Sequence, residues 1–136
     1  MLDYLTQQSK QGLGPYTDFL KWCIKRYEKI ETQSTTLDIK DIQFKKKACY
    51  VNAANVVLHY PEVNYVLGYV ASVIPIEHAW CEHHGVHFDP TASLFEDDHF
   101  KEYGRVITLN EEQLTQWLEE NQCVPPNLEG IWRSND

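Results

Sequence analysis

Apolar side chains recur at helical spacing in three segments of the chain. Residues 15–30 place them three or four positions apart. Residues 49–60 are rich in alanine, valine and leucine, which predicts a buried helix that begins at or near Cys49. Residues 110–121 have an apolar face behind Asn110, a favourable helix cap. The pattern therefore predicts a central helix with one helix nearer each end of the chain.

Between the central and last helices the pattern changes to that of strands. β-Branched and aromatic residues dominate, and turn residues separate the runs. The predicted strands are residues 64–76, 78–84, 86–91 and 105–109. Residues 37–44 are expected to form a short strand or an extended approach to the central helix. Residues 1–14 and 123–136 are expected to be irregular, with Trp132 holding the tail. This order predicts an α+β fold of one domain, residues 1–136, with the central helix packed on a small antiparallel sheet.

Composition and charge narrow the classes of function. The 136 residues include 12 basic and 20 acidic side chains, a net charge of −8, which argues against a nucleic-acid partner. The chain has neither an apolar run long enough to cross a membrane nor the pattern of a signal peptide, so we expect a cytoplasmic protein. The four cysteines form no CxxC pair, and free thiols are expected.

Residues 78–91, HAWCEHHGVHFDPT, concentrate four of the six histidines and one cysteine. These are residue types that bind zinc. Strand alternation, however, places Cys81 and His83 on the face opposite His78 and His84, so a closed tetrahedral site would need bulges that the sequence does not indicate. We therefore expect no metal and no cofactor, and expect the three histidines after Cys81 to be solvated turn residues.

Cys49 is the candidate nucleophile. At the start of a helix, unpaired backbone N–H groups and the positive end of the helix dipole stabilise a thiolate. The cluster Lys45, Lys46 and Lys47 adds positive charge on the same side. A thiolate nucleophile also needs a base and a group that orients this base.

His78 and Asp89 fit these two roles through hairpin geometry. If residues 78–84 and 86–91 form a hairpin with a two-residue turn at His84 and Gly85, Trp80 pairs with Asp89. His78 is then a diagonal neighbour of Asp89 on the same face of the sheet. Any loop of even length keeps the two side chains together.

Three further residues are candidates for the same site. Gln43 lies six residues before Cys49, where its amide, together with the Cys49 N–H, could donate to a developing oxyanion. Such donors contribute roughly 2.7–4 kcal/mol each in acyl transfer. Trp80 is expected to belong to the core or to form a wall of the substrate cleft, and Tyr50 is the second cleft candidate.

Four motifs together resemble the core of the papain-like superfamily. They are C-Y-x-N-A from Cys49, Y-V-x-G-Y-V from Tyr65, H-A-W from His78 and F-D-P-T from Phe88. The transglutaminase-like branch is the most similar, whereas a glutamine six residues before the cysteine is a papain-like trait. The resemblance covers about residues 43–91 and implies a Cys49 nucleophile, a His78 base and an orienting Asp89. The short interval between cysteine and histidine, and Tyr50 after the cysteine, depart from these families and leave the substrate class open.

The sequence thus predicts a cysteine-dependent acyl-transfer enzyme, a thiol hydrolase or transferase with a Cys-His-Asp triad. Its substrate would be a protein, a peptide or another amide, and the reaction hydrolysis (peptidase, amidase or deamidase) or transglutaminase-like transfer to an amine. The alternative is a catalytically weak or inactive member of the same fold that acts as an acidic protein-binding module or inhibitor. The oligomeric state stays open.

Overall fold

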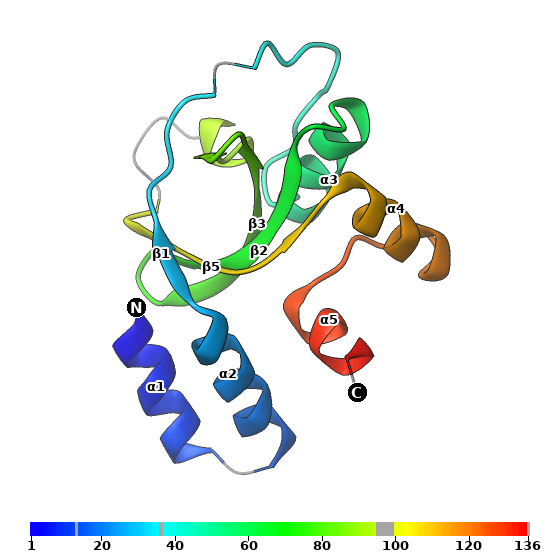
Figure 1. Ribbon diagram of the computed structural model, residues 1–136. Helices are drawn as coiled ribbons and strands as arrows, with labels where there is room; N and C mark the ends of the chain where they lie inside the picture. Colours follow the sequence, from blue (N-terminus) through cyan, green and yellow to red (C-terminus); the bar gives the residue numbers. More distant parts are fainter. Residues whose placement is uncertain (13, 36, 95–99, 136) are drawn as a thin grey trace.

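Helices surround a curled, antiparallel sheet in the part of the chain that the structure describes, residues 1–12, 14–35, 37–94 and 100–135 of a computed structural model (Figure 1). The helices are α1 (Leu2–Gln11), α2 (Pro15–Arg26), α3 (Cys49–His59), α4 (Glu111–Glu120) and α5 (Leu128–Ser134), with a 3₁₀ turn at Ala92–Leu94. The strands are β1 (Glu28–Ile30), β2 (Asn64–Ala71), β3 (Pro75–His83), β4 (Val86–Phe88) and β5 (Glu102–Leu109). The predicted α+β class is confirmed, and α3 begins at Cys49 and packs on the sheet. No helix in the described ranges is long and apolar enough to cross a membrane.

The sheet curls until its two edges meet. Its strand order is β1-β5-β2-β3-β4, and all neighbours in the sheet are antiparallel. Thr32, just beyond β1, forms a parallel bridge with His87 of β4, and the Gln33 N–H donates to the His87 carbonyl at 2.9 Å. This contact closes the sheet into a small barrel, visible as the ring of strands in Figure 1.

The curled sheet separates two apolar clusters. The larger cluster lies on the face covered by helices and contains Tyr65, Leu67 and Tyr69 of β2. Val66 and Val70, which alternate with them, belong to the smaller cluster with Trp80 and Tyr103, inside the curl. Strand alternation therefore places His78, two residues from Trp80, on the inner face.

Two glycines allow β2 and β5 to come close together beside His78. Gly68 pairs with His78 on one side, and a register shift follows Leu67 on the β5 side. A Cβ atom added to Gly68 would lie 2.0 Å from the Gly104 carbonyl oxygen and 2.8 Å from the Trp80 ring. Only a residue without a side chain fits here.

Both ends of the chain are more regular than predicted. Residues 2–11 form α1, which packs on α2 and buries Leu5 and Ser9. The tail contains α5, where the predicted anchor Trp132 packs against the Phe19 ring with a centroid separation of 5.4 Å. Both helices are short and weakly apolar, so tertiary contacts stabilise them rather than their own sequence pattern.

Several predicted boundaries are also wrong, and the strand predicted at 86–91 ends at Phe88. The helix predicted at 15–30 ends at Arg26, because Tyr27 is extended (φ −63°, ψ 131°) and leads into β1. The strand predicted at 64–76 is interrupted at residues 72–74, and Pro75 begins β3. In contrast, the two-residue turn at His84 and Gly85 is confirmed by the register of β3 and β4.

Candidate active site

Cys49 is the first residue of α3, at a helix terminus that no side chain caps. The N-cap residue Ala48 makes no capping hydrogen bond from its side chain, and the first turn contains no acidic residue. The Cys49 side chain is half-buried. The unpaired N–H groups of the first turn are therefore oriented to stabilise negative charge on the sulfur.

His78 lies between Cys49 and Asp89. It is 4% exposed, and its Nε2 atom is 2.7 Å from Asp89 Oδ2. The Cys49 side chain is close enough to the His78 ring to raise the pKa of this ring. Because Nε2 binds the carboxylate, Nδ1 is the ring nitrogen left for the sulfur. The structure thus brings together the three residues that the sequence predicts.

The surroundings of His78 favour its protonated form. Burial alone would lower the pKa of His78, but the hydrogen bonds with Asp89 and Cys49 and the negative charges of both groups outweigh it and raise this pKa to about 9. An imidazolium is therefore the dominant form at neutral pH. A positively charged ring beside the sulfur stabilises the thiolate.

The Asp89 carboxylate accepts hydrogen bonds at both of its oxygens. Oδ2 accepts from His78 and from the Tyr103 hydroxyl at 2.6 Å. Oδ1 accepts from the backbone N–H groups of Thr91 at 3.0 Å and Ala92 at 3.1 Å. The side chain is 2% exposed. The turn after β4 therefore holds the carboxylate in one orientation, which in turn fixes the imidazole.

Asn52 connects the segment before the cysteine to the turn that holds Asp89. Its Nδ2 atom donates to the Lys45 carbonyl and to Thr91 Oγ1, each at 2.8 Å, and its Oδ1 atom accepts from the Lys45 N–H at 3.1 Å. Asn52 is 2% exposed. One buried amide one turn after Cys49 thus links the two halves of the site.

Aromatic rings enclose His78 inside the barrel. The Phe100 ring is centred 4.8 Å from the imidazole, and the Trp80 ring is centred 6.3 Å away. Trp80 has no exposed surface, and its Nε1 atom donates to His87 Nδ1 at 3.0 Å. Trp80 thus lies in the core of the protein, and its role as a wall of the substrate cleft stays a prediction. His87, predicted to be solvated, is instead half-buried and accepts this bond.

The remaining two candidates lie on either side of the cysteine in sequence. Tyr50 is half-buried against the larger apolar cluster. Burial and the negative charges of Glu77 and Cys49 raise the pKa of Tyr50. Gln43 is exposed on the extended segment before α3 and has no hydrogen-bond partner among the described residues. The proposed oxyanion role of Gln43 stays a prediction.

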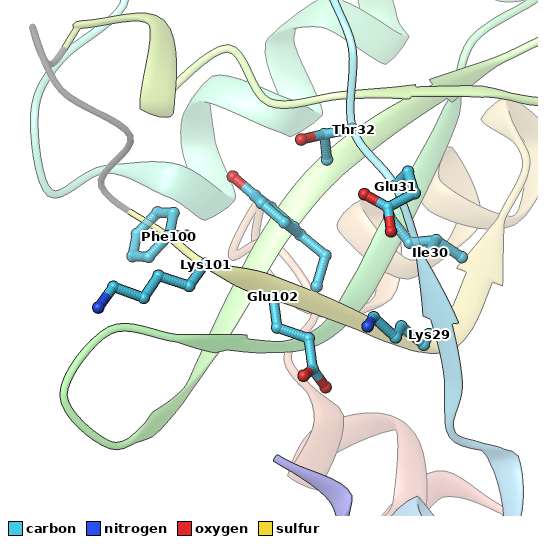
Figure 2. Close-up of a pocket in the computed structure, with 8 residues that line it drawn as sticks. Lys29, Ile30, Glu31, Thr32, Phe100, Lys101 and Glu102 are labelled. Carbon is cyan, nitrogen blue, oxygen red and sulfur yellow. The ribbon is translucent and has the colours of Figure 1, made fainter.

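Two pockets open at the Asp89 end of the site. Figure 2 shows the first, of about 420 Å³, where Lys29, Ile30, Glu31 and Thr32 face Phe100, Lys101 and Glu102. The second, of about 450 Å³, lies between residues 32–35, Ile39, Phe44 and the turn that carries Asp89. Thr32 and Tyr103 line both pockets. Asp89 itself lines the second pocket.

Sequence reasoning missed Tyr103 and the role of Asn52. The strand predicted at 105–109 began too late to include Tyr103, which pairs with Val70 of β2 and so shares the inner face with His78. Asn52 is one of two asparagines in an otherwise largely apolar helix segment, which is a signal for a buried hydrogen-bonding role.

The four cysteines are free thiols, and Cys23 and Cys81 are buried. Within the described ranges, no three or more His, Cys, Asp or Glu side chains are grouped so as to hold a metal ion.

No protein-family model matches the chain, and the comparisons with curated proteins and with solved structures gave no match either. The geometry of the site is therefore the basis for any functional assignment.

Proposed function

We propose that this protein is a cysteine-dependent acyl-transfer enzyme with Cys49 as nucleophile, His78 as acid and base, and Asp89 as the group that orients His78. The observation that carries the proposal is the arrangement of three neighbouring side chains, in which His78 interacts with both Cys49 and Asp89. The Cys49 side chain is close enough to raise the pKa of His78, whose Nε2 atom lies 2.7 Å from an Asp89 carboxylate that is 2% exposed. A nucleophile, a base and an orienting group in this order are what acyl transfer through a thioester requires.

In the acylation step, the Cys49 thiolate attacks the carbonyl carbon of an amide, ester or thioester. The C–S bond forms as the carbonyl π electrons move to oxygen, and the Cys49 N–H, with the Gln43 amide as second donor, stabilises this oxyanion. The tetrahedral intermediate collapses as the His78 imidazolium gives its proton to the leaving group. The acyl group is left on sulfur, and His78 is neutral.

In the deacylation step, neutral His78 removes a proton from water or from an amine as it attacks the thioester. The thiolate leaves, and the imidazolium is restored beside it. Asp89 stays ionised throughout and stabilises the charged ring. Water yields a carboxylic acid and an amine yields a new amide, so access to the thioester decides between hydrolysis and transfer.

A chromogenic ester tests the proposal without knowledge of the natural substrate. With p-nitrophenyl acetate, we expect release of p-nitrophenol and an acetyl group on Cys49 in peptides analysed by mass spectrometry. Cys49→Ser should abolish this acetylation, and His78→Ala should slow it by roughly 10²-fold or more. Cys123→Ser is the matched control, because Cys123 is exposed and distant in sequence from the site, and it should leave the rate unchanged.

The opposite result favours the binding module. If acetylation is spread over several cysteines or lysines, at a rate that His78→Ala does not change, then Cys49 is an ordinary thiol and the enzyme proposal fails. The net charge of −8 would then point to a basic protein partner.

A further inference from the structure

Two donors share one oxygen of the Asp89 carboxylate. The His78 Nε2 atom is 2.7 Å from Oδ2 and the Tyr103 hydroxyl is 2.6 Å from the same atom. The other oxygen is held separately, by the backbone N–H groups of Thr91 and Ala92. The carboxylate would therefore keep its position if one donor to Oδ2 were removed.

The Tyr103 ring is fixed from several sides. In β5 it pairs with Ile30 of β1 and Val70 of β2, and it is 6% exposed. Its ring meets the Trp80 ring edge-on at 5.1 Å and the Phe100 ring edge-on at 5.9 Å. The hydroxyl is thus directed at Asp89 by the packing of the barrel interior.

We propose that Tyr103 is a positioning residue that sets the proton affinity of His78 by sharing the Asp89 oxygen with it. The importance of this effect for catalysis rests on the proposed function. The hydrogen-bonding effect itself depends only on the geometry of the three side chains.

The sign of the effect follows from charge. A neutral hydroxyl that donates to a carboxylate stabilises its negative charge and weakens the attraction between this oxygen and the imidazolium. Without the hydroxyl, Asp89 holds the proton on His78 more tightly. A ring that holds its proton too tightly is a poor acid towards the leaving group.

Few other charges act on His78 within the described part of the chain. Asp89 from the turn after β4 and Cys49 from α3 are the two charged groups that interact with it. From β2 the facing residue is Gly68, and the neighbouring Trp80 and Phe100 rings are uncharged. Tyr103 from β5 acts through Asp89.

Titration of the His78 ring by NMR tests the proposal directly. With ¹³C-labelled histidine, and with the His78 signal assigned by its loss in His78→Gln, we expect Tyr103→Phe to raise the His78 midpoint by about one pH unit. Tyr65→Phe is the matched control. The buried Tyr65 hydroxyl also makes one hydrogen bond, to the Pro126 carbonyl at 2.8 Å, but within the described ranges it makes none to His78 or Asp89. This variant should leave the midpoint unchanged.

Replacement of tyrosine by 3-fluorotyrosine gives the reverse test without loss of the hydroxyl. Fluorination makes the phenol a stronger donor, so the His78 midpoint should fall by a few tenths of a pH unit. The proposal would be overturned if the His78 midpoint were unchanged in both Tyr103→Phe and the fluorotyrosine protein, or if it fell in Tyr103→Phe. Because this readout needs no turnover, it stays valid if p-nitrophenyl acetate fails to acetylate Cys49, so the two proposals fail separately.

Discussion

At the residue scale, a few buried polar side chains create the chemistry of the site. His78, Asp89 and Asn52 are each almost without solvent contact, and each has its polar atoms bonded to named partners. Buried groups of this kind are costly unless they are paired, so their pairing fixes their positions. The same pairing makes the stability of the protein depend on pH.

The raised pKa of His78 predicts that part of the folding stability is lost at high pH. The folded protein holds this proton up to about pH 9, whereas the unfolded chain releases it near 6.5. The stabilisation is complete below about pH 6.5 and disappears as the pH rises through about 9. Between pH 6 and pH 9.5, the free energy of unfolding in urea should fall by up to a few kcal/mol more for the wild type than for His78→Gln. A constant difference between the two proteins would contradict this prediction.

Asn52→Ala should destabilise the protein and disorder the approach to Cys49. The substitution leaves both polar groups of the Lys45 backbone and the Thr91 hydroxyl without this partner, at an expected cost of about 2–4 kcal/mol in urea unfolding. Thr91→Val removes only one of these bonds and should cost about 1 kcal/mol. Equal costs for the two variants would show that the bonds to Lys45 contribute nothing.

At the scale of the elements, local sequence patterns predicted the helix that begins at Cys49 and the hairpin that brings His78 and Asp89 together. The run after Ala48 predicted α3, and alternation with a turn at His84 and Gly85, where φ is 52° and 84°, predicted the hairpin that pairs His78 with Asp89. The β5 segment at Tyr103 was missed because its apolar pattern is interrupted by Gly104. That glycine is present for a tertiary reason, since the Tyr27 ring would occupy the position of its Cβ atom.

Gly68→Ala should prevent β2 and β5 from pairing beside His78. The added methyl group would overlap the Gly104 carbonyl oxygen, which is backbone and cannot rotate away. We expect a loss of more than about 3 kcal/mol in thermal or urea unfolding. Gly85→Ala is the control: its φ of +84° costs about 1 kcal/mol, but nothing lies within 4 Å of the added atom. Comparable losses would refute the close approach of the two strands.

At the scale of the whole molecule, closure of the sheet creates the buried environment of His78 and Asp89. The closing contact joins Thr32 and Gln33 to His87, residues far apart in the chain. No local pattern signals such a contact, so the sequence predicted a small sheet but not its closure. The same contact places His87 against Trp80 in the interior rather than in solvent.

Acidification should weaken the barrel through His87. Burial lowers the pKa of His87 below 6.5, and its Nδ1 atom accepts the Trp80 N–H only when the ring is neutral. The unfolded chain takes up a proton near pH 6.5 that the folded protein resists, so this stabilisation is present above 6.5 and is lost as the pH falls. In His87→Gln, the amide oxygen can accept from Trp80 without titrating. Between pH 7 and 5, urea unfolding should therefore show wild type losing more stability than His87→Gln, and equal losses would contradict this account.

The measurement that tests the central claim most directly is the pH dependence of Cys49 alkylation by iodoacetamide, followed site by site with mass spectrometry. Exposed Cys123 serves as the internal reference. Alkylation of an ordinary thiol slows about tenfold for each pH unit in the range where the thiol form dominates, because only the thiolate reacts. An imidazolium–thiolate pair predicts that the Cys49 rate instead levels off between pH 8 and 5, and that His78→Ala restores the tenfold dependence. If the Cys49 and Cys123 rates fall in parallel in wild type, Cys49 is an ordinary thiol and the proposed triad is wrong.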